Sequence, residues 1–426
     1  MKNLTSLKER NNKVAILHYA GPPTVGGVES TIYHHARLLA DFGLKVTVIA
    51  GRGEDFNPDV EFHLIPGLNT RDEYVQLVSK ELARGAVTSK FDRLRDHITS
   101  DLARILSDID VCIVHNAMSL HLNLSLTAAL KKINDEKITR LVAWNHDFAW
   151  HDKLYIPDLH EGYPWDLLRT PWSGVKYVVV SEHRKIRLAE LLDIPETEIE
   201  VVTPGVDIFE FLECHNLTKE LFDKLDLLKA NPLMLLPARI IPRKNIKYAL
   251  NITAALVEKM PNSMLVITGP PGPHNPKNLE YLNNLKKIRK DNNLEKNVHF
   301  LYEQGKDGEP FILPDKIVSD LFRIADLLLF PSSREGFGIP VLEAGLAKLP
   351  VFASDIPPIR ESGDGYVNLF DSDGDPKNVA ECIYEFALKD NVHKLRRRVI
   401  EQFSWSAIVK NKVIPKALDT WRIKNL

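Results

Sequence analysis

The sequence predicts an α/β protein built from two doubly wound halves. Short apolar runs recur along the chain, segments of helical period separate most of them, and 426 residues are too many for one ordinary core. Because strands that alternate with helices are joined by crossover connections, we expect a largely parallel sheet in each half.

The first half begins with an apolar run at residues 13–19. A glycine-rich segment, an amphipathic segment ending at Leu39 and a second apolar run at residues 45–50 follow it. This order of strand, loop, helix and strand forms one doubly wound unit. Further strands of this half are expected at residues 111–114, 141–144 and 175–180.

The second half begins near residue 232, and the join between the halves is expected around residues 204–231. Its apolar runs are short enough for buried strands, and helical patterns separate most of them. These strands are expected at residues 233–238, 264–268, 298–302, 327–330 and 350–353.

The bulk composition is that of a globular chain without special partners. Hydrophobic residues make up 44%, charged residues make up 26% and the net charge is -2, so nothing indicates a nucleic-acid partner. Cys112, Cys214 and Cys382 lie far apart and form neither a disulfide framework nor a metal spacing, which favours a reducing compartment. No signal peptide or transmembrane segment is apparent, so we expect a cytoplasmic protein.

Residues 330–343 carry two carboxylates, Glu335 and Glu343, around a glycine-rich turn. A buried strand is expected before them, and Pro340 suits the first turn of a helix, where it removes no hydrogen bond. Glu335 should therefore lie in the loop beyond the strand, where ligands bind in open parallel sheets, and Glu343 about one turn into the helix. Free amides from Gly336 to Gly338 at the positive helix end would bind an anion. Acids beside an anion site indicate a ligand with both phosphate and hydroxyl groups, such as a sugar nucleotide.

A second loop of the same half carries cations. Arg239 and Lys244 follow the expected strand at residues 233–238 and could grip a diphosphate, the arginine by its fork and the lysine as a point charge. A departing dianion needs such charge, from cations or from a metal. Arg243 is expected to face solvent or to have a secondary role. An exposed basic loop without a ligand is the alternative.

These motifs resemble those of a known family. The segment Glu335-Gly-Phe-Gly-Ile-Pro-Val-Leu-Glu343, with two serines before it and Ala-Gly after it, is similar to the Glu-x7-Glu signature of retaining GT-B glycosyltransferases, the family-4-like enzymes or glycosyl transferases group 1. The spacing Arg239-x4-Lys244 matches that family's phosphate-binding pair. The resemblance spans nearly the whole chain but is specific only at the motifs.

The resemblance implies two Rossmann-like domains that face each other across a cleft, with a C-terminal helix that crosses back to the first domain. We expect an acceptor-side domain at residues 1–204, a nucleotide-sugar-binding domain at 205–402 and a helical return at 403–426. Residues 70–107 are long, charged and helical in pattern. They form either part of an acceptor wall or a solvated helical insertion.

The resemblance also assigns roles in the second domain. Arg239 and Lys244 would neutralise the leaving nucleoside diphosphate, and Glu343 would accept hydrogen bonds from ribose hydroxyls. Glu335 would face the hydroxyls of the donor sugar. The backbone at Gly336, Phe337 and Gly338 would lie close to the donor.

Two further loops are expected to bind the nucleotide. Gly269 lies in a turn that in the family approaches the nucleotide, and backbone groups near Tyr302 correspond to the base pocket. The prolines after Gly269, and the lack of the glycine that many relatives carry near Tyr302, depart from the family's usual form. The identity of the base therefore stays open.

In the first domain, Gly26 and Gly27 resemble the family's Gly-Gly-x-Glu segment, whose amides approach the diphosphate or the acceptor. The segment lacks the glycine spacing of a dinucleotide site and the ending of a phosphate loop. A structural turn is the alternative, with Glu29 as an acid that complements the start of the helix.

His146 follows the expected strand at 141–144, and the resemblance implies that it contacts the donor sugar as the catalytic residue of this domain. A packing or capping histidine is the alternative, and His115 is a weaker candidate for the same place. A metal site is another reading of this segment, with the ligands His146, Asp147, His151 and Asp152. The five-residue spacing of the histidines does not put both on one helix face, so no metal is expected.

The function that follows is a retaining, metal-independent transfer of a hexose from a UDP- or GDP-linked donor to a hydroxyl acceptor, with no cofactor. The acceptor could be a sugar, a small metabolite or a lipid-linked molecule. The basic run at residues 394–398 could touch an anionic membrane, although a solvated helix face is the commoner reading. A sugar-nucleotide epimerase of the same fold and a catalytically silent sugar-nucleotide-binding protein are the alternatives.

Overall fold

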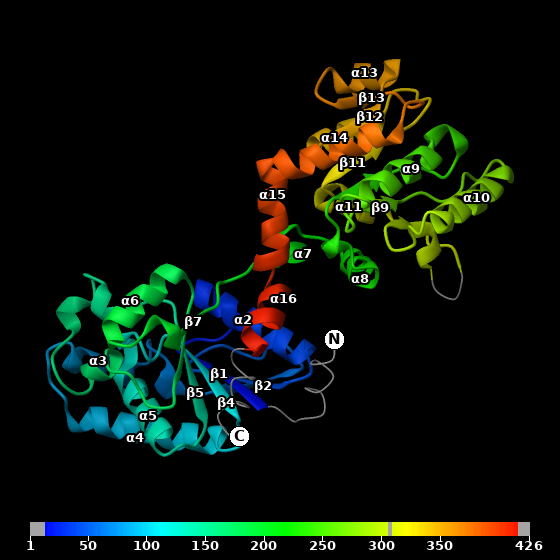
Figure 1. Cartoon of the computed structure of the whole chain (residues 1–426). Coiled ribbons are helices and arrows are strands. Elements are labelled where there is room, and N and C mark those ends of the chain that lie inside the picture. The colour runs from blue at the N-terminus through cyan, green and yellow to red at the C-terminus, as the bar shows by residue number, and fades with distance from the viewer. Residues whose placement is uncertain (1–12, 306–308, 416–426) are drawn as a thin grey trace. The chain divides into compact units, whose positions relative to one another are not determined.

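The computed structural model describes residues 13–305 and 309–415 of the chain. They divide into two compact units (Figure 1). The first unit extends to Val206 and resumes at Gln402, and the second unit is Asp207–Glu401. Each unit contains a parallel sheet covered by helices on both faces, which confirms the predicted α/β class.

The sheet of the first unit has seven strands in the order β3-β2-β1-β4-β5-β6-β7, and every neighbouring pair is parallel. β1 pairs along its whole length with β2, from Lys13 opposite Lys45 to His18 opposite Ala50. The strands are β1 (Lys13–His18), β2 (Lys45–Ala50), β3 (Val60–Leu64), β4 (Val111–His115), β5 (Arg140–Asn145), β6 (Lys176–Val179) and β7 (Ile199–Val201).

Alternate residues of these strands enter two separate cores. Ala15 and Leu17 of β1 point to the face that α3 (Glu73–Leu82), α4 (Ser89–Leu106), α5 (Leu124–Asp135) and α6 (Glu182–Leu192) cover. Val14 and Ile16 point to the opposite face, covered by α2 (Gly27–Asp41). The outer strands β3 and β7 were not predicted, because their residues are only partly buried and the apolar signal is correspondingly weak.

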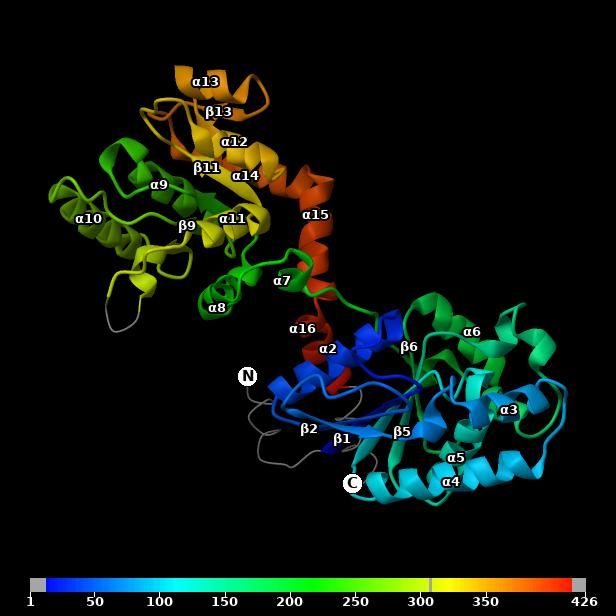
Figure 2. The same ribbon diagram turned by 180° about the vertical axis from the view of Figure 1, so that it is seen from behind.

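The C-terminal segment packs on the first unit beside α2 (Figure 2). The backbone N–H of Val206 donates to the carbonyl of Phe403 at 2.8 Å, and Trp405 begins α16 (Trp405–Ile408). Ile408, Val409 and Val413 then join the core beneath α2. Residues 416–426 of the expected helical return lie outside the described residues.

The sheet of the second unit has six parallel strands in the order β10-β9-β8-β11-β12-β13. One face is covered by α9 (Ile246–Val257), α10 (Lys277–Asp291) and α14 (Pro376–Lys389), and the other by α8 (Asn216–Leu225), α11 (Asp315–Ile324), α12 (Ile339–Leu346) and α13 (Pro357–Gly363) (Figures 1 and 2). α15 (Asn391–Arg398) follows α14. The strands are β8 (Leu233–Leu236), β9 (Met264–Ile267), β10 (Val298–Phe300), β11 (Leu327–Phe330), β12 (Val351–Ser354) and β13 (Asn368–Phe370).

Two details differ from the sequence-based expectation. β10 ends at Phe300 rather than at residue 302, because a 3-10 turn over Leu301–Gln304 follows it at once. The edge strand β13 was not predicted, and its first two residues are exposed. Among the residues that the structure describes, no helix has the length and apolarity needed to cross a membrane.

Candidate active site

The strand order of the second unit reverses between β8 and β11. These two strands are parallel neighbours, with Leu327 opposite Met234, but the chain continues from them in opposite directions across the sheet. The loops that follow them therefore begin side by side and diverge, which leaves the crevice where open α/β sheets bind ligands. The cations predicted to bind phosphate follow β8, and Glu335 follows β11.

Backbone contacts join these two loops. Ser333 donates its backbone N–H to the carbonyl of Arg243 at 2.9 Å, and its hydroxyl donates to the same oxygen at 3.2 Å. In return, Nη1 of Arg243 donates to the carbonyl of Arg334 at 3.0 Å. The position of Glu335 relative to the cations is thus fixed by backbone geometry and not only by charge.

Glu335 lies between two cations. Its Oε1 accepts a hydrogen bond from Lys244 Nζ, and its Oε2 lies 3.2 Å from Arg243 Nη1. The side chains of Glu335 and Lys244 are only 9% and 11% exposed, whereas that of Arg243 is 40% exposed. The Lys244 ammonium also lies 5.0 Å from the centre of the buried Phe330 ring, in a cation–π contact.

The charge state of Glu335 follows from these contacts. Burial by itself would raise the pKa of this carboxyl, because it disfavours the charged form. The hydrogen bond and charge of Lys244 and the charge of Arg243 act in the opposite direction and leave the pKa below its ordinary value. Glu335 is therefore a carboxylate at neutral pH and can accept hydrogen bonds from hydroxyl groups.

The turn from Glu335 into α12 depends on one of its two glycines. Gly338 has a φ of 97°, and a Cβ there would lie 2.6 Å from Cδ1 of Ile359. Gly336 has open space around it, and Phe337 between the two glycines is 41% exposed. Pro340 lies in the first turn of α12, as predicted.

Glu343 is exposed and is the fifth residue of α12, in the predicted position along the chain. It does not line the same space as Glu335. It lines a groove of about 630 Å³ between α11 and α12, together with Asp315, Ser319 and Arg323. The two acids of the motif therefore do not line one common groove.

Arg239 is exposed, and no described residue forms an ion pair with it. Arg239 and Lys244 therefore share no partner among the described side chains, and Arg243 is the second cation beside Glu335. Sequence reasoning gave Arg243 at most a secondary role. The available signal was Pro242, because it starts a tight 3-10 turn at Pro242–Lys244 that brings both cations to Glu335.

Gly269 has a structural reason to be glycine. A Cβ there would lie 2.2 Å from the carbonyl oxygen of Ala238, and the backbone N–H of Gly269 donates to that oxygen at 3.1 Å. The loop after β9 can therefore lie directly against the loop that carries Arg239. Tyr302 is half-buried, and its carbonyl accepts a hydrogen bond from the N–H of Phe311 at 3.0 Å.

In the first unit, His146 follows β5 and is held by the loop after β4. Its backbone N–H donates to Oδ1 of Asn116 at 2.8 Å, and its Nε2 lies 3.1 Å from Nδ1 of the fully buried His115. Burial, followed by the charges of His18 and Arg184, lowers the pKa of His146 to about 4, so the imidazole is neutral at pH 7. The structure thus brings the two predicted histidines of this unit together.

Two other predicted features of this unit have local partners. The Asp147 carboxylate forms an ion pair with Arg184 at 2.7 Å. Gly26 precedes α2 with an extended φ of 175°, and a Cβ there would lie 2.1 Å from Oε2 of Glu29, which folds back over the start of the helix. Gly27 begins α2 and has open space around it.

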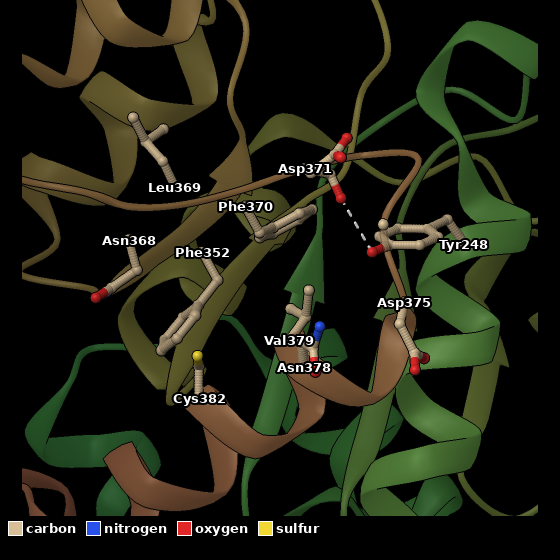
Figure 3. A pocket seen from close by; sticks show the side chains of 11 residues that line it. Tyr248, Phe352, Asn368, Leu369, Phe370, Asp371, Asp375, Asn378, Val379 and Cys382 are labelled. Atoms are coloured by element: carbon tan, nitrogen blue, oxygen red, sulfur yellow. Dashed lines mark hydrogen bonds between the residues drawn. The ribbon is translucent and has the colours of Figure 1, made fainter.

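A separate cavity of about 420 Å³ lies between β13, α9 and α14 (Figure 3). Tyr248, Phe352 and Phe370 line this cavity, and its two carboxylates already accept hydrogen bonds from backbone N–H groups. Asp375 caps α14 by accepting from the N–H of Lys377 at 3.0 Å, and Asp371 accepts from the N–H of Asp373 at 2.9 Å. The Tyr248 hydroxyl donates to the Asp371 carbonyl at 3.1 Å. Neither Glu335 nor Lys244 lines this cavity, so the crevice at β8 and β11 remains the better candidate.

Two family models match the chain. Residues 218–403 match the family model for glycosyl transferases group 1, and residues 25–209 match the model for Glycosyltransferase Family 4. Mannosylglucosylglycerate synthase of Thermotoga maritima is 24% identical, and the alignment covers 92% of this chain and 91% of that protein. D-inositol 3-phosphate glycosyltransferase of Salinispora tropica is 25% identical, with coverages of 93% and 81%.

A glycosyltransferase structure from Rickettsia africae aligns over 95% of this chain and 97% of its own, with 15% identity and a TM-score of 0.35. The two family models carry the assignment. They meet close to the boundary between the two units, and the match to glycosyl transferases group 1 includes Arg243, Lys244, Glu335 and Glu343. The chain belongs to the family-4-like glycosyltransferases.

Proposed function

We propose that this glycosyltransferase moves a hexose from a UDP- or GDP-linked donor to a hydroxyl group of its acceptor, with retention of configuration and without a metal ion. The observation that carries the proposal is the cluster of Lys244, Arg243 and Glu335 at the reversal of strand order in the second unit. It offers positive charge for phosphates beside an acceptor for sugar hydroxyls.

The diphosphate of the donor would bind to the cations of the loop after β8. Lys244 and Arg243 each carry one positive charge, and the exposed Arg239 could add a third. Such charge stabilises the negative charge that develops on the leaving group as the bond to the sugar breaks. Because the cations can supply this stabilisation, the proposed reaction needs no divalent metal.

The hydroxyls of the donor would bind to the two acids of the motif. Glu335 is a carboxylate fixed by two cations, so it can accept hydrogen bonds from the sugar without itself taking a proton. Glu343 would accept from the ribose hydroxyls, with the nucleoside in the groove between α11 and α12. Asp315 and Ser319 supply further polar groups in that groove.

Retention would follow from attack on the same face from which the leaving group departs. The acceptor oxygen forms a bond to the anomeric carbon, the bond from that carbon to the phosphate oxygen breaks, and the acceptor proton passes to the leaving phosphate. This route requires no protein nucleophile. His146, which is neutral at pH 7, would contact the donor sugar through a hydrogen bond rather than through charge.

The names of two relatives suggest the class of acceptor. One is named for a glycerate conjugate and the other for D-inositol 3-phosphate, and both names describe a polyol with an acidic group. Among the acceptor classes that the sequence leaves open, we therefore propose a small polyol that carries a carboxylate or a phosphate.

The test begins with thermal unfolding in EDTA against UDP, GDP, ADP and their common sugar conjugates. A ligand that binds only the folded protein raises the Tm by mass action. A shift with one nucleotide family identifies the base. Transfer to an acidic polyol is then followed by NMR, in which the configuration of the product reports retention or inversion. A protein that is folded but shifted by none of these ligands contradicts the proposal.

A further inference from the structure

The cavity between β13, α9 and α14 has no part in the proposed reaction, because neither Glu335 nor Lys244 lines it. Its volume of about 420 Å³ falls within the range of about 300–1,000 Å³ that is usual for small-molecule sites. It lies at one edge of the second sheet, where β13 pairs with β12 alone. A ligand in this cavity would therefore be bound in addition to the donor.

Three aromatic rings from three different elements line this cavity. Tyr248 comes from α9, Phe352 from β12 and Phe370 from β13 (Figure 3). The centres of the Tyr248 and Phe370 rings are 6.0 Å apart. Val379 of α14 adds an aliphatic surface. Because the faces of aromatic rings carry partial negative charge, such a lining attracts cations as well as apolar groups.

Two carboxylates lie beside these rings. Asp371 and Asp375 line the cavity, and each accepts a backbone N–H with its Oδ1. Within the described part of the chain, neither Oδ2 accepts a hydrogen bond and neither carboxylate forms an ion pair. None of the described lining residues is a lysine, an arginine or a histidine. The cavity is therefore negatively charged and contains no cation of its own.

This negative charge acts on a group that lines the cavity. Burial raises the pKa of the Tyr248 hydroxyl above its ordinary value, and the charges of the three aspartates in residues 371–375 raise it further. These charges disfavour an ionised tyrosine because they repel a second negative charge. For the same reason they favour a cation in that place.

The acidic wall of the cavity is held in place by the beginning of α9. Nδ2 of Asn245 donates to the carbonyl of Ser372 at 3.3 Å, and the Tyr248 hydroxyl donates to the carbonyl of Asp371 at 3.1 Å. The segment that carries the carboxylates is thus fixed before a ligand binds. A site formed in advance loses less conformational entropy on binding, which increases its affinity.

The geometry of the carboxylates disfavours a metal ion as the ligand. Residues 371–375 contain three aspartates, but among the described residues no three carboxylate oxygens of this segment lie within 4.8 Å of one another. A hard metal ion needs several oxygen ligands around one point. A larger cation, whose charge is spread over alkyl groups, can instead contact the rings and the carboxylates together.

We propose that this cavity is a second ligand site, and that it binds a small organic cation with an alkylated ammonium group. The alkyl groups contact the rings of Tyr248 and Phe370, and the carboxylates of Asp371 and Asp375 balance the charge. Free metabolites and lipid headgroups both contain such a group. The inference does not depend on the proposed function, because none of the residues that line the cavity belongs to the donor site.

The experiment uses the whole chain and two probes, choline and 3,3-dimethylbutanol. The two have the same shape, but the alcohol has a carbon atom in place of the charged nitrogen. Binding is measured by calorimetry and saturation-transfer NMR at low ionic strength, where charges are screened least. We expect choline to bind about 10-fold more tightly or better. Equal affinity for the two probes, or no binding of choline, overturns the inference.

Three variants make the test specific to the cavity. Asp371→Asn removes the charge but keeps an acceptor for the N–H of Asp373, and Phe370→Leu removes the ring but keeps an apolar side chain. Each should weaken choline binding by about 5-fold or more. Asp291→Asn removes an exposed carboxylate at the end of α10, outside the cavity, and should change nothing. Thermal unfolding checks that each variant is folded.

The outcome for Asp371→Asn is decisive, because the exposed Asp371 side chain can change without disturbing the core. Full choline binding by this variant, or an equal loss of binding in Asp291→Asn, overturns the inference. Vesicles of phosphatidylcholine then separate the two sources of the ligand. Sedimentation with the vesicles that excess choline abolishes assigns the site to a lipid headgroup, whereas choline binding without sedimentation assigns it to a free metabolite.

Discussion

Lys244 and Glu335 form an ion pair at the carboxyl edge of the second sheet, although 91 residues separate them in the sequence. Both side chains are almost fully buried, so each is the main counter-charge of the other. A buried charge that loses its partner destabilises the fold, whereas the loss of both charges together costs much less. This asymmetry gives a way to separate the structural and catalytic roles of the pair.

The first prediction concerns Lys244→Ala. The variant leaves Glu335 buried with only Arg243 as a partner, so the free energy of unfolding should fall by roughly 1–3 kcal/mol. Transfer should fall by about 100-fold or more, because a group that stabilises the leaving phosphate is lost. Denaturant titration and kcat/KM measure the two effects.

The control for this prediction lies three residues away. Lys247 is exposed on α9, and Lys247→Ala should leave stability and turnover unchanged. The double variant Lys244→Ala/Glu335→Gln should regain most of the lost stability but none of the activity. If the double variant regains turnover, the pair has only a structural role.

The second prediction uses the two glycines that flank Phe337. Gly338→Ala places a methyl group 2.6 Å from Ile359 at a positive φ, so it should destabilise the second unit by about 1–3 kcal/mol. Gly336→Ala meets no atom within 4 Å and should leave stability unchanged. If the donor approaches the backbone here, Gly336→Ala should still raise the KM for the donor. Melting curves and initial rates of the two variants test the contrast, and equal destabilisation would contradict it.

The third prediction concerns the contact between His115 and His146. Only one proton can lie between Nδ1 of His115 and Nε2 of His146, which are 3.1 Å apart. Nε2 of His115 is buried without a partner among the described residues. An unprotonated ring nitrogen without a donor costs less free energy there than a buried N–H without an acceptor. His115 should therefore donate to His146, which leaves His146 with its proton on Nδ1.

Long-range ¹⁵N–¹H correlation spectra report this tautomer directly, without reference to activity. His115→Asn keeps an N–H close to the position of Nδ1 and should retain most of the kcat, whereas His115→Leu should lose at least 10-fold. A protonated Nε2 on His146 contradicts the assignment. Equal kcat in both variants would show that His115 does not position His146.

The strands that sequence patterns predicted are those buried on both faces, such as β4 and β11, because their apolar runs are continuous. β3 and β13 were not predicted, because they are partly exposed and their apolar runs are not continuous. The loop position of Glu335 was readable because Pro340 marks the start of the next helix. The partners of Glu335 could not be predicted from the sequence, because its contact with Arg243 exists only once β8 and β11 are neighbours in the sheet.

Residues 70–107 could not be placed from the sequence for the same reason. The sequence showed only that this stretch is longer than a plain connection. Its helices α3 and α4 pack on one face of the first sheet, and that face exists only after the strands have paired.

The last prediction is a loss of stability in mild acid. His35 on α2 is fully buried, and burial, followed by the charges of His146 and His34, lowers its pKa to about 3. The ordinary pKa of a histidine is about 6.5, so between that pH and about 3 the unfolded chain binds a proton that the folded chain does not. The free energy of unfolding must therefore fall as the pH drops below about 6.5, and His35 alone should account for about 2 kcal/mol at pH 5.

The variant His35→Leu tests the source of this effect. Neither ring nitrogen of His35 has a hydrogen-bond partner among the described residues, so leucine should cost little at pH 7.5 and should flatten the decline toward pH 5. The described tryptophans all belong to the first unit, which contains His35, so tryptophan fluorescence in urea reports its unfolding. A decline of the same steepness in the variant would assign the acid sensitivity to His146 and His115, whose pKa values burial also lowers.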